Sequence, residues 1–358
     1  MNKSRYIKEA TANSYCDLMK IIYNDGNDLR DNFVFRGLED SSYDLTPSAL
    51  RKKNNKLNNF IGNDFVLSQQ MSVEYAIERG FVDEGDVPEE LNEIVIERDK
   101  TGKVTSWGKG NVVCDDGYFQ VKKELYVLFK FLNFADRSGL KVTDDFEVRN
   151  NIHNYMEYNP KWWPNEKFRE VISLAQHYGL PTRFLDWSYD YKSALYFALK
   201  DIVEKPLDKD GVLWAFNYKL FENVNNNGPF FNKLHLYRSE YNRNPNLQAQ
   251  KGLFTFIVDD VNYLFDKSLD DRLIDELNGV REEDQHWFTG QFALVANVHV
   301  PDDEFLFYRI TIPKDEKPNF LKDLYRDGYS EEYLFPGYGG AVKAMENRIK
   351  LESFFEDK

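Results

Sequence analysis

The chain has 358 residues, and its 46 Lys and Arg against 60 Asp and Glu give a formal net charge of −14 at pH 7. A surface devoted to duplex phosphate needs an excess of positive charge, so this composition argues against a dedicated duplex-DNA binder and leaves room only for a local basic groove. The length permits one large domain or two, each able to bury a core.

The expected compartment follows from two further features. The N-terminal residues include no apolar stretch of the kind that a secretory signal needs, and no run approaches the roughly 18 apolar residues of a membrane span. The two cysteines, Cys16 and Cys114, form no metal-ligand pattern. We therefore expect a cytoplasmic protein with reduced thiols, no membrane contact and no metal.

The N-terminal part of the chain is predicted to be mainly helical. Apolar spacing predicts a helix from about Thr11 to Asn24, and the apolar run Phe33-Val34-Phe35 predicts a short strand that ends at Arg36-Gly37. Two more helices are expected over 63–79 and 122–136, where apolar residues recur at helical spacing.

Residues 82–120 are expected to form a surface insertion rather than a second domain. Within them, IVIERDKTGKVTSWG alternates apolar and polar residues around the turn signal DKTGK, which predicts a β-hairpin. The flanking segments are acidic and rich in turn residues. The insertion has too few apolar residues for a core of its own.

The C-terminal part is predicted to contain strands followed by helices. Strands are expected at GVLWAFN, GLFTFIV, QFALVANVHV and FLFYRITIP, all rich in Val, Phe, Ile and Tyr. The ending is predicted to be helix, turn, helix, with Gly328 as a helix stop. Because helices come mostly first and strands mostly later, without βαβ alternation, the predicted fold class is α+β.

Residues 174–199 contain the densest group of reactive side chains. His177, Arg183, Asp186, Trp187 and Ser188 all precede an amphipathic helix within a dozen positions. At such a position, side chains and helical N–H groups can both contact an anion. The competing structural interpretations are a hydrogen-bonded His177 and an Asp186 or Ser188 that caps the helix.

Three other places combine reactive side chains with turn residues. Arg36, after an apolar strand and before a Gly, fits either a phosphate clamp or an ion pair. Glu331 and Glu332, between a Gly-terminated helix and LFPG, fit a working carboxylate or a helix cap. Trp162 and Trp163, between two prolines, fit a core or a stacking surface at a cleft.

Common catalytic motifs are absent from the sequence. It has no phosphate-binding loop, dinucleotide Gly fingerprint, His-Glu-x-x-His, paired Cys motif or Ser nucleophile elbow. This argues against the common metal hydrolases, kinases and lipases.

Five segments, in this order and spacing, resemble the FRG domain family. They are FVFRG at 33–37, QHYGLPTRFLDWSYDYKSALYFA at 176–198, LQAQKGLFTF at 247–256, YRITIP at 308–313 and GYSEEYLFPGYGG at 328–340. The family takes its name from Phe-Arg-Gly, which is Phe35, Arg36 and Gly37 here. The resemblance covers about residues 30–345 and implies a single domain over 1–358.

The layout of the FRG family is similar to that of ADP-ribosyltransferases, which implies a split mixed or antiparallel β core with N-terminal helices and surface insertions. It also implies a site for NAD made of an Arg, a strand end followed by a helix, and a late Glu. The resemblance assigns catalytic positions to Arg36, Glu331, Glu332 and Gln250. Glu331, Glu332 and Gln250 compete for the late position, and Glu331 is the preferred candidate. It assigns NAD contacts to Arg36, Gly37, His177, Thr182, Arg183, Asp186, Trp187 and Ser188.

The resemblance therefore implies an NAD-dependent ADP-ribosyltransferase that modifies a macromolecule such as single-stranded RNA or another nucleic acid. A carboxylate would stabilise the oxocarbenium-like centre that forms when nicotinamide leaves the ribose. The expected setting is a bacterial toxin or anti-phage defence effector with an antitoxin partner. The alternatives are an NAD glycohydrolase and a non-catalytic nucleotide-binding sensor.

Overall fold

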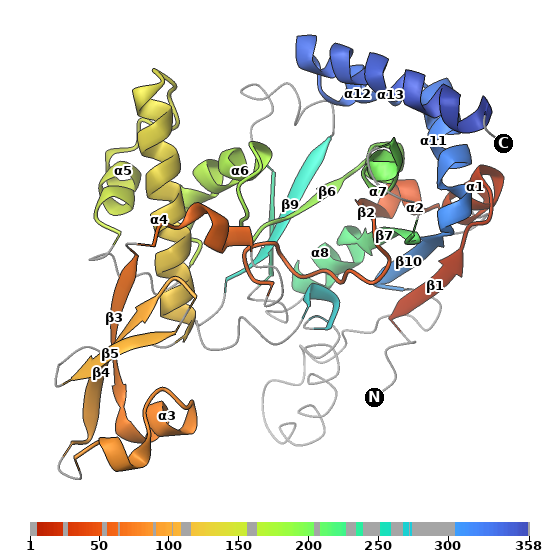
Figure 1. Ribbon diagram of the computed structural model, residues 1–358. Coiled ribbons are helices and arrows are strands. Elements are labelled where there is room, and N and C mark those ends of the chain that lie inside the picture. The colour runs from red at the N-terminus through yellow and green to blue at the C-terminus, as the bar shows by residue number, and fades with distance from the viewer. Residues whose placement is uncertain are drawn as a thin grey trace. The chain divides into compact units, whose positions relative to one another are not determined.

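Figure 1 shows the chain as a computed structural model. The structure describes residues 6–23, 28–51, 56–63, 65–88, 91–101, 103–108, 116–155, 163–203, 208–226, 234–238, 251–258, 268–271, 273 and 305–356. The predicted strand at 291–300 and three residues singled out above, Cys114, Trp162 and Gln250, lie outside the described residues.

The chain forms two compact units. The first, here called the sheet unit, comprises Met1–Leu45, Leu185–Thr255 and Ser268–Lys358. The second, the helical unit, comprises Thr46–Phe184 and Phe256–Lys267. The predicted insertion at 82–120 belongs to the helical unit.

A mixed seven-stranded sheet organises the first unit. Its strands are β1 (Ile7–Thr11), β2 (Phe33–Leu38), β6 (Leu185–Ser188), β7 (Gly211–Asn217), β8 (Leu234–Tyr237), β9 (Gly252–Ile257) and β10 (Phe307–Ile312). Their order is β1-β10-β7-β2-β6-β9-β8. β1 pairs with β10 in parallel, whereas β10–β7, β7–β2, β2–β6 and β6–β9 are antiparallel. Together with the helices, this mixed sheet confirms the α+β class.

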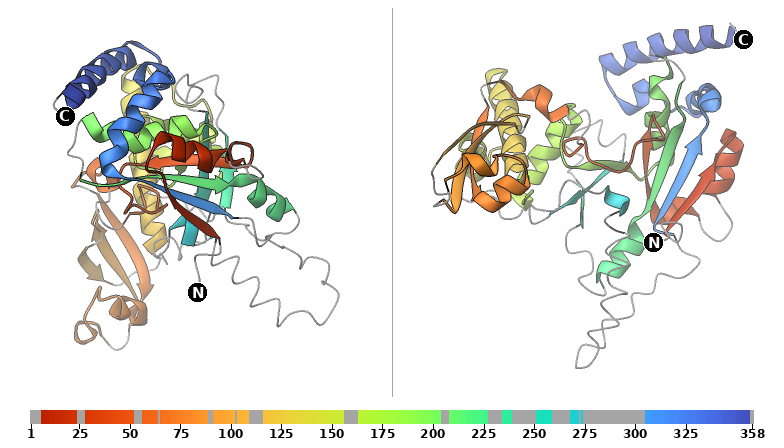
Figure 2. Two further views of the ribbon diagram at one scale, coloured as in Figure 1. Left: turned by 90° about the vertical axis from the view of Figure 1, so that its right-hand side faces the viewer. Right: turned by 60° about the horizontal axis from the view of Figure 1, so that its bottom comes forward.

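One face of this sheet is buried under helices. The helices of the sheet unit are α1 (Tyr15–Ile22), α2 (Leu29–Asn32), α7 (Tyr191–Leu199), α8 (Tyr218–Asn226), α11 (Lys317–Arg326), α12 (Glu331–Leu334) and α13 (Tyr338–Glu356). Alternate residues of β2, β7 and β10 share one core with α7 and α11, because successive side chains of a strand point to opposite faces. The last helix, blue in Figure 2 and ending at the C label, packs against α12.

The helical unit combines helices with a three-stranded antiparallel sheet. Its strands are β3 (Val66–Ser72), β4 (Glu93–Asp99) and β5 (Val104–Gly108), in the order β3-β4-β5. Its helices are α3 (Val73–Glu78), α4 (Asp116–Arg137), α5 (Phe146–His153) and α6 (Arg169–His177). The antiparallel pairing of β4 with β5 confirms the predicted hairpin.

Two predicted helices need correction. The chain is already a strand from Ile7 to Thr11, and the first helix starts only at Tyr15, where the Ser14 side chain caps it by accepting from Asp17 N. The helix predicted over 63–79 is instead β3 followed by α3. Leu67 and Met71 are four residues apart, which suits a helix and a strand alike, and pairing with β4 decides for the strand.

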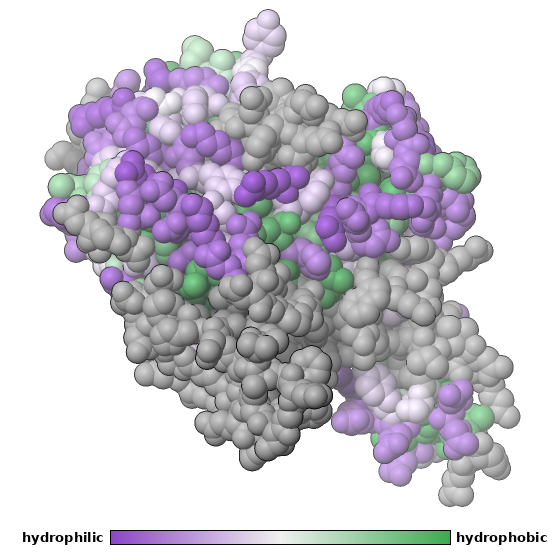
Figure 3. Space-filling model, turned by 180° about the vertical axis from the view of Figure 1, so that it is seen from behind, coloured by the Kyte–Doolittle hydropathy of each residue, from purple (hydrophilic) through white to green (hydrophobic). Residues whose placement is uncertain are grey.

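The other described elements agree with the sequence. The strands at 211–217, 252–258 and 305–313 correspond to β7, β9 and β10, and the helix at 122–136 lies within α4. Gly328, with φ +83°, follows the end of α11 as expected. No helix among the described residues has the length and apolarity to cross a bilayer. On the face drawn in Figure 3, the residues not in grey are largely hydrophilic, with apolar side chains in small groups.

Candidate functional site

The Phe-Arg-Gly triplet lies inside β2, and each of its residues has a different environment. Phe35 is buried in the core, where its ring centroid lies 6.0 Å from that of Tyr191 on α7. At Gly37, an added Cβ would lie 1.9 Å from the carbonyl oxygen of Ala194, so only glycine allows α7 to approach the strand this closely. The strand continues to Leu38, so the sequence-based placement of Arg36 at a strand end was wrong.

Arg36 reaches across to the neighbouring strand β6. Its Nη1 donates to the carbonyl oxygen of Asp186 at 2.8 Å and lies 2.7 Å from the Asp186 carboxylate. The Arg36 side chain is 12% exposed, whereas that of Asp186 is 58% exposed. The arginine is therefore fixed by a backbone oxygen and carries a carboxylate that solvent reaches.

Two buried N–H donors on neighbouring strands lack acceptors among the described residues. Trp214 on β7 lies opposite Arg36 on β2, so the two side chains emerge on the same face of the sheet. Neither Nε of Arg36 nor Nε1 of Trp214 has a hydrogen-bond partner within the described part of the chain. Trp214 was missed by sequence analysis because GVLWAFN shows only an apolar strand, with no sign of its register against Arg36.

The turn after β6 is organised by residues that serve the backbone. Trp187 is buried and its Nε1 donates to Thr255 Oγ1 at 2.8 Å, so its ring does not present a face for stacking on nicotinamide. Asp190 caps α7 by accepting from Lys192 N, and Ser188 Oγ accepts from Asp190 N at 2.9 Å. The assignment of the cap to Asp186 or Ser188 was therefore wrong, because the helix begins at Tyr191.

The capping carboxylate joins three of the segments that carry the family resemblance. Its Oδ2 accepts from Tyr329 OH at 2.6 Å and lies 3.3 Å from Lys251 Nζ. Tyr329 belongs to GYSEEY, and Lys251 to LQAQKGLFTF. Burial and the hydrogen bond to Asp190 raise the pKa of Tyr329, so its hydroxyl remains a donor at neutral pH. Segments that are far apart in the sequence therefore meet at the start of α7.

Glu331 is a buried acceptor. It is 2% exposed, and its carboxylate accepts from Tyr196 OH at 2.8 Å, Tyr325 OH at 2.9 Å and Asn347 Nδ2. Burial and the charge of Glu331 raise the pKa of Tyr325. The residue starts the helix α12. Its hydrogen-bonding capacity is used by the protein itself.

Glu332, by contrast, faces solvent. It is exposed, and its Oε1 accepts from Arg348 Nη2 at 2.7 Å. Burial acts to raise its pKa, but Ser330 and the charge of Arg348 outweigh that effect and lower it below its usual value. Of the two late glutamates, Glu332 is the ionised carboxylate that a ligand can reach.

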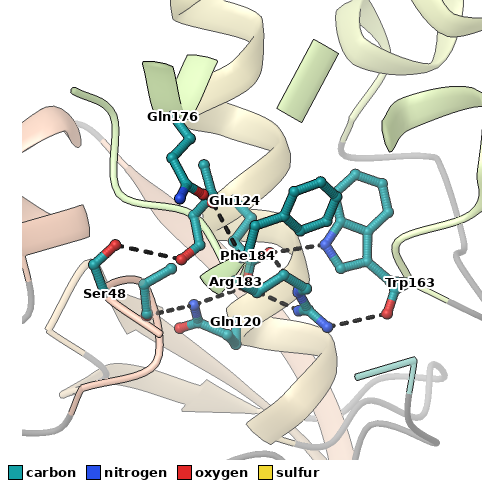
Figure 4. Close-up of polar contacts among 9 residues, drawn as sticks. Ser48, Gln120, Glu124, Trp163, Gln176, Arg183 and Phe184 are labelled. Carbon is teal, nitrogen blue, oxygen red and sulfur yellow. Dashed lines mark hydrogen bonds and ion pairs between the residues drawn. The ribbon is translucent and has the colours of Figure 1, made fainter. Parts of the chain in front are cut away.

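In the helical unit, Arg183 lies in a closed polar network (Figure 4). It is 1% exposed, and its Nε and Nη2 donate to the two oxygens of Glu124 at 2.8 and 2.9 Å. Its Nη1 donates to the carbonyl oxygen of Trp163. Glu124 also accepts from Gln120 and from Trp163 Nε1. With its guanidinium paired and buried, Arg183 does not offer a phosphate contact.

The other candidate residues of the helical unit also contact parts of the protein itself. Thr182 is buried, donates to Gln176 and accepts from Phe184 N at 3.1 Å. Trp163 is buried and packs edge-on against Phe168, so it belongs to the core rather than to a cleft rim. His177 ends α6, and burial lowers its pKa, which favours the neutral imidazole.

Residues 126–206 match the family model of the FRG domain. The similarity to the FRG domain is thus shown for this stretch of the chain. The match confirms the resemblance inferred from the sequence over this stretch, which includes α6, β6 and α7. No curated protein and no solved structure matches the chain. Arg36 and both late glutamates lie outside the matched stretch, and Arg36 is tied to it through Asp186.

No metal centre accompanies the FRG domain in the described ranges, where no group of three or more His, Cys, Asp or Glu side chains is placed to hold an ion. The candidate site of the sheet unit consists of Arg36, Asp186 and Trp214 on the sheet. Glu332 lies in α12, where its described ion pair is with Arg348.

Proposed function

We propose that this FRG-domain protein is an NAD-dependent ADP-ribosyltransferase that modifies a macromolecule. The observation that carries the proposal is the contact between Arg36 and Asp186, which brings the Phe-Arg-Gly arginine to the DWS strand that precedes α7. This is the pairing of segments that the ADP-ribosyltransferase layout requires for its first two parts.

Arg36 is suited to the pyrophosphate of NAD. The Asp186 carboxylate is the solvent-facing partner of the pair, so another anion can take its place beside the guanidinium. A pyrophosphate oxygen pair can accept bidentate, charge-assisted bonds from a guanidinium. The unpartnered Nε of Arg36 and Nε1 of Trp214 support an acceptor in this place, since buried donors are normally paired.

The reacting carboxylate in this proposal is Glu332. Its lowered pKa keeps it ionised at neutral pH. The bond between nicotinamide and the ribose breaks, nicotinamide leaves with the electron pair, and the carboxylate stabilises the positive charge that develops on the ribose. The nucleophile of the acceptor then forms the new bond and loses its proton. Glu331 holds α12 in place by accepting hydrogen bonds from Tyr196, Tyr325 and Asn347.

The acceptor in this proposal is single-stranded RNA or another nucleic acid, and the biological role is that of a bacterial toxin or defence effector with an antitoxin partner. Both follow from the family resemblance. The net charge of −14 disfavours tight nonspecific binding and suits transient capture of the acceptor.

The test is transfer of label from NAD to cell extract, followed by separate nuclease and protease digestion. We expect labelled, nuclease-sensitive product from the wild type and at least about a hundredfold less from Arg36→Ala. Arg30→Ala is the matched control, because Arg30 also pairs with an aspartate but lies exposed in α2. Equal transfer by Arg36→Ala refutes the proposal. Free ADP-ribose without a labelled macromolecule instead supports the glycohydrolase.

A second candidate function is a non-catalytic module that binds a nucleotide. The observation that favours it is the commitment of Glu331 and Trp187 to internal hydrogen bonds, which leaves few groups for chemistry. Calorimetry with NAD and ADP-ribose distinguishes the two functions. A sensor binds without turnover and keeps its affinity in Glu332→Gln.

A further inference from the structure

The last helix of the sheet unit, α13, has one side buried in the protein and an apolar side that faces solvent. Ala344 and Leu351 lie on the buried side. The exposed side carries four large apolar residues, whose exposed fractions are 95% for Tyr338, 56% for Val342, 67% for Met345 and 65% for Ile349. Single apolar residues on a surface are normal, whereas a row of them along one helix is a candidate interaction site.

These four residues, here called the α13 stripe, have the spacing of a contact between two helices. They follow one another at intervals of four, three and four residues. In an α-helix their directions fall within an arc of about 60°, which is centred about 140° away from Ala344 and Leu351. Positions a and d of a heptad have this spacing, and they form the seam of packed helices. The stripe therefore has the geometry of one half of a helix pair.

The stripe is complementary to a second copy of itself that runs in the opposite direction. When the second helix is turned about the midpoint of the stripe, Tyr338 lies opposite Ile349 of the second copy, and Val342 lies opposite its Met345. A two-fold axis repeats each of these contacts, so every residue of the stripe meets an apolar residue. No other chain is needed to cover it.

The charges beside the stripe suit the same arrangement. Glu346 borders one edge and Arg348 the other, and both are exposed. The Arg348 guanidinium lies 2.7 Å from the Glu332 carboxylate, which compensates its charge within one copy. In the antiparallel register Glu346 lies nearest in level to Gly339 and Lys343 of the second copy. Opposite charges therefore meet at that edge, which favours this register.

The stripe is large enough for a reversible dimer. Typical side-chain areas give its exposed apolar surface as roughly 300–450 Å² in one copy. Apolar atoms supply about 60% of an interface, so two copies with their polar rims would bury about 1,000–1,500 Å² together. This total lies at the lower end of the range for specific complexes.

We propose that the α13 stripe is a homodimer interface, in which α13 packs antiparallel against α13 of a second copy of this chain. The residues of the interface are not used in the proposed ADP-ribosyl transfer. An interface of this size corresponds to a dissociation constant of about 1–10 μM, so the protein exchanges between monomer and dimer.

The first experiment measures the dissociation constant of the full chain by sedimentation equilibrium between about 1 and 100 μM. We expect Met345→Lys to weaken the dimer at least about tenfold, because it places an unpaired charge in the seam. The matched control is Phe134→Lys, which changes a residue of α4 that is 65% exposed, and it keeps the wild-type constant. If Met345→Lys has a lower melting temperature than the wild type, Ile349→Lys replaces it.

The second experiment tests the direction of the two helices by oxidative cross-linking, in a chain with Cys16→Ser and Cys114→Ser. The double variant Tyr338→Cys with Ile349→Cys is expected to form disulfide-linked dimers. Tyr338→Cys alone is expected to stay unlinked, because the antiparallel register separates the two cysteines by about 16 Å along the helix. Disulfides need Cα atoms within about 7 Å of each other. Efficient linkage of Tyr338→Cys alone shows a parallel pair and overturns the proposed packing.

Two results of the sedimentation experiment overturn the homodimer: a wild type that is monomeric up to about 100 μM, and a Met345→Lys variant with an unchanged dissociation constant. A monomeric wild type that binds lipid vesicles assigns the stripe to a membrane surface instead. Arg36→Ala is expected to dimerise as the wild type does, whatever its label transfer. The homodimer and the proposed function therefore fail separately.

Discussion

Replacing Gly37 by alanine tests the tight contact on which the position of α7 depends. The added Cβ would lie 1.9 Å from Ala194 O and 2.8 Å from Ala198 N, both backbone atoms of α7. Real Cβ contacts are essentially never shorter than 3.0 Å, so the helix has to move by about 1 Å or the strand has to bend. Neither neighbour is a flexible side chain that can turn aside.

The cost can be estimated from packing. Overfilling a well-packed core typically costs about 1–3 kcal/mol, and here the displaced helix carries Leu195 and Ala198, which are fully buried in the main core. Replacing a strand glycine by alanine regains about 0.5–1 kcal/mol of backbone entropy. Because both clashing atoms are backbone, we take the upper end of the packing cost, which leaves a net loss of about 2 kcal/mol in the free energy of unfolding of the sheet unit.

The assay is urea denaturation followed by tryptophan fluorescence, with Gly339→Ala as the control. A Cβ at Gly339 meets no atom within 4 Å, and the residue lies in the first turn of α13. That variant is expected to unfold at the same or a slightly higher urea concentration. A Gly37→Ala midpoint indistinguishable from that of Gly339→Ala would refute the reasoning about close packing.

Three other variants test the remaining networks. Arg183→Met leaves Glu124 buried without its cation and is expected to lower the free energy of unfolding by about 3–5 kcal/mol, measured by denaturation. Adding Glu124→Leu should recover part of that loss. A double variant no more stable than Arg183→Met contradicts the pairing of the two charges. Glu331→Gln should lower thermal stability more than Glu332→Gln, because only Glu331 is buried among three donors, and the opposite order of melting temperatures would be inconsistent with the structure. Lys123→Met should be more stable than the wild type at pH 7 by up to about 3 kcal/mol, since the pKa of Lys123 falls from 10.5 to about 8 on folding. Between these two pKa values the unfolded state binds more protons, so the wild type gains stability as the pH rises and the difference in stability between Lys123→Met and the wild type becomes smaller. A difference that stays constant from pH 7 to 10 would contradict the lowered pKa.

Local sequence signals were sufficient wherever one pattern dominates. The Val- and Phe-rich runs at β7, β9 and β10 and the turn signal between β4 and β5 fit only strands, because β-branched and aromatic residues alternate there or are bounded by turns. Gly328 ends α11 because glycine adopts the positive φ of +83° without strain. The segment that matches the FRG domain was also recognisable from its residues alone.

Tertiary pairing decided the segments in which two patterns compete. Residues 66–72 fit a helix and a strand, and only hydrogen bonding to β4 selects the strand. The sequence analysis likewise considered Asp186 and Ser188 as caps of α7, and the actual cap, Asp190, depends on where the chain leaves β6.

The roles of polar residues depended most on the tertiary structure. From the sequence alone, Arg36 and Arg183 can take the same two roles, since a guanidinium can pair with a carboxylate or clamp a phosphate. The fold places Arg183 against Glu124 at 1% exposure, and it leaves Arg36 beside a carboxylate that faces water. Similarly, adjacent glutamates differ because one helical step of about 100° turns Glu331 into the core and Glu332 outward.

The sequence by itself therefore determined the α+β class, most of the described strands and the FRG segment, because these depend on local periodicity and turn chemistry. Only the tertiary structure decided which polar side chains stabilise the fold through internal contacts and which remain accessible to solvent. Burial and partner geometry arise from contacts between segments more than a hundred residues apart, such as Tyr196 with Glu331, and no local pattern encodes them.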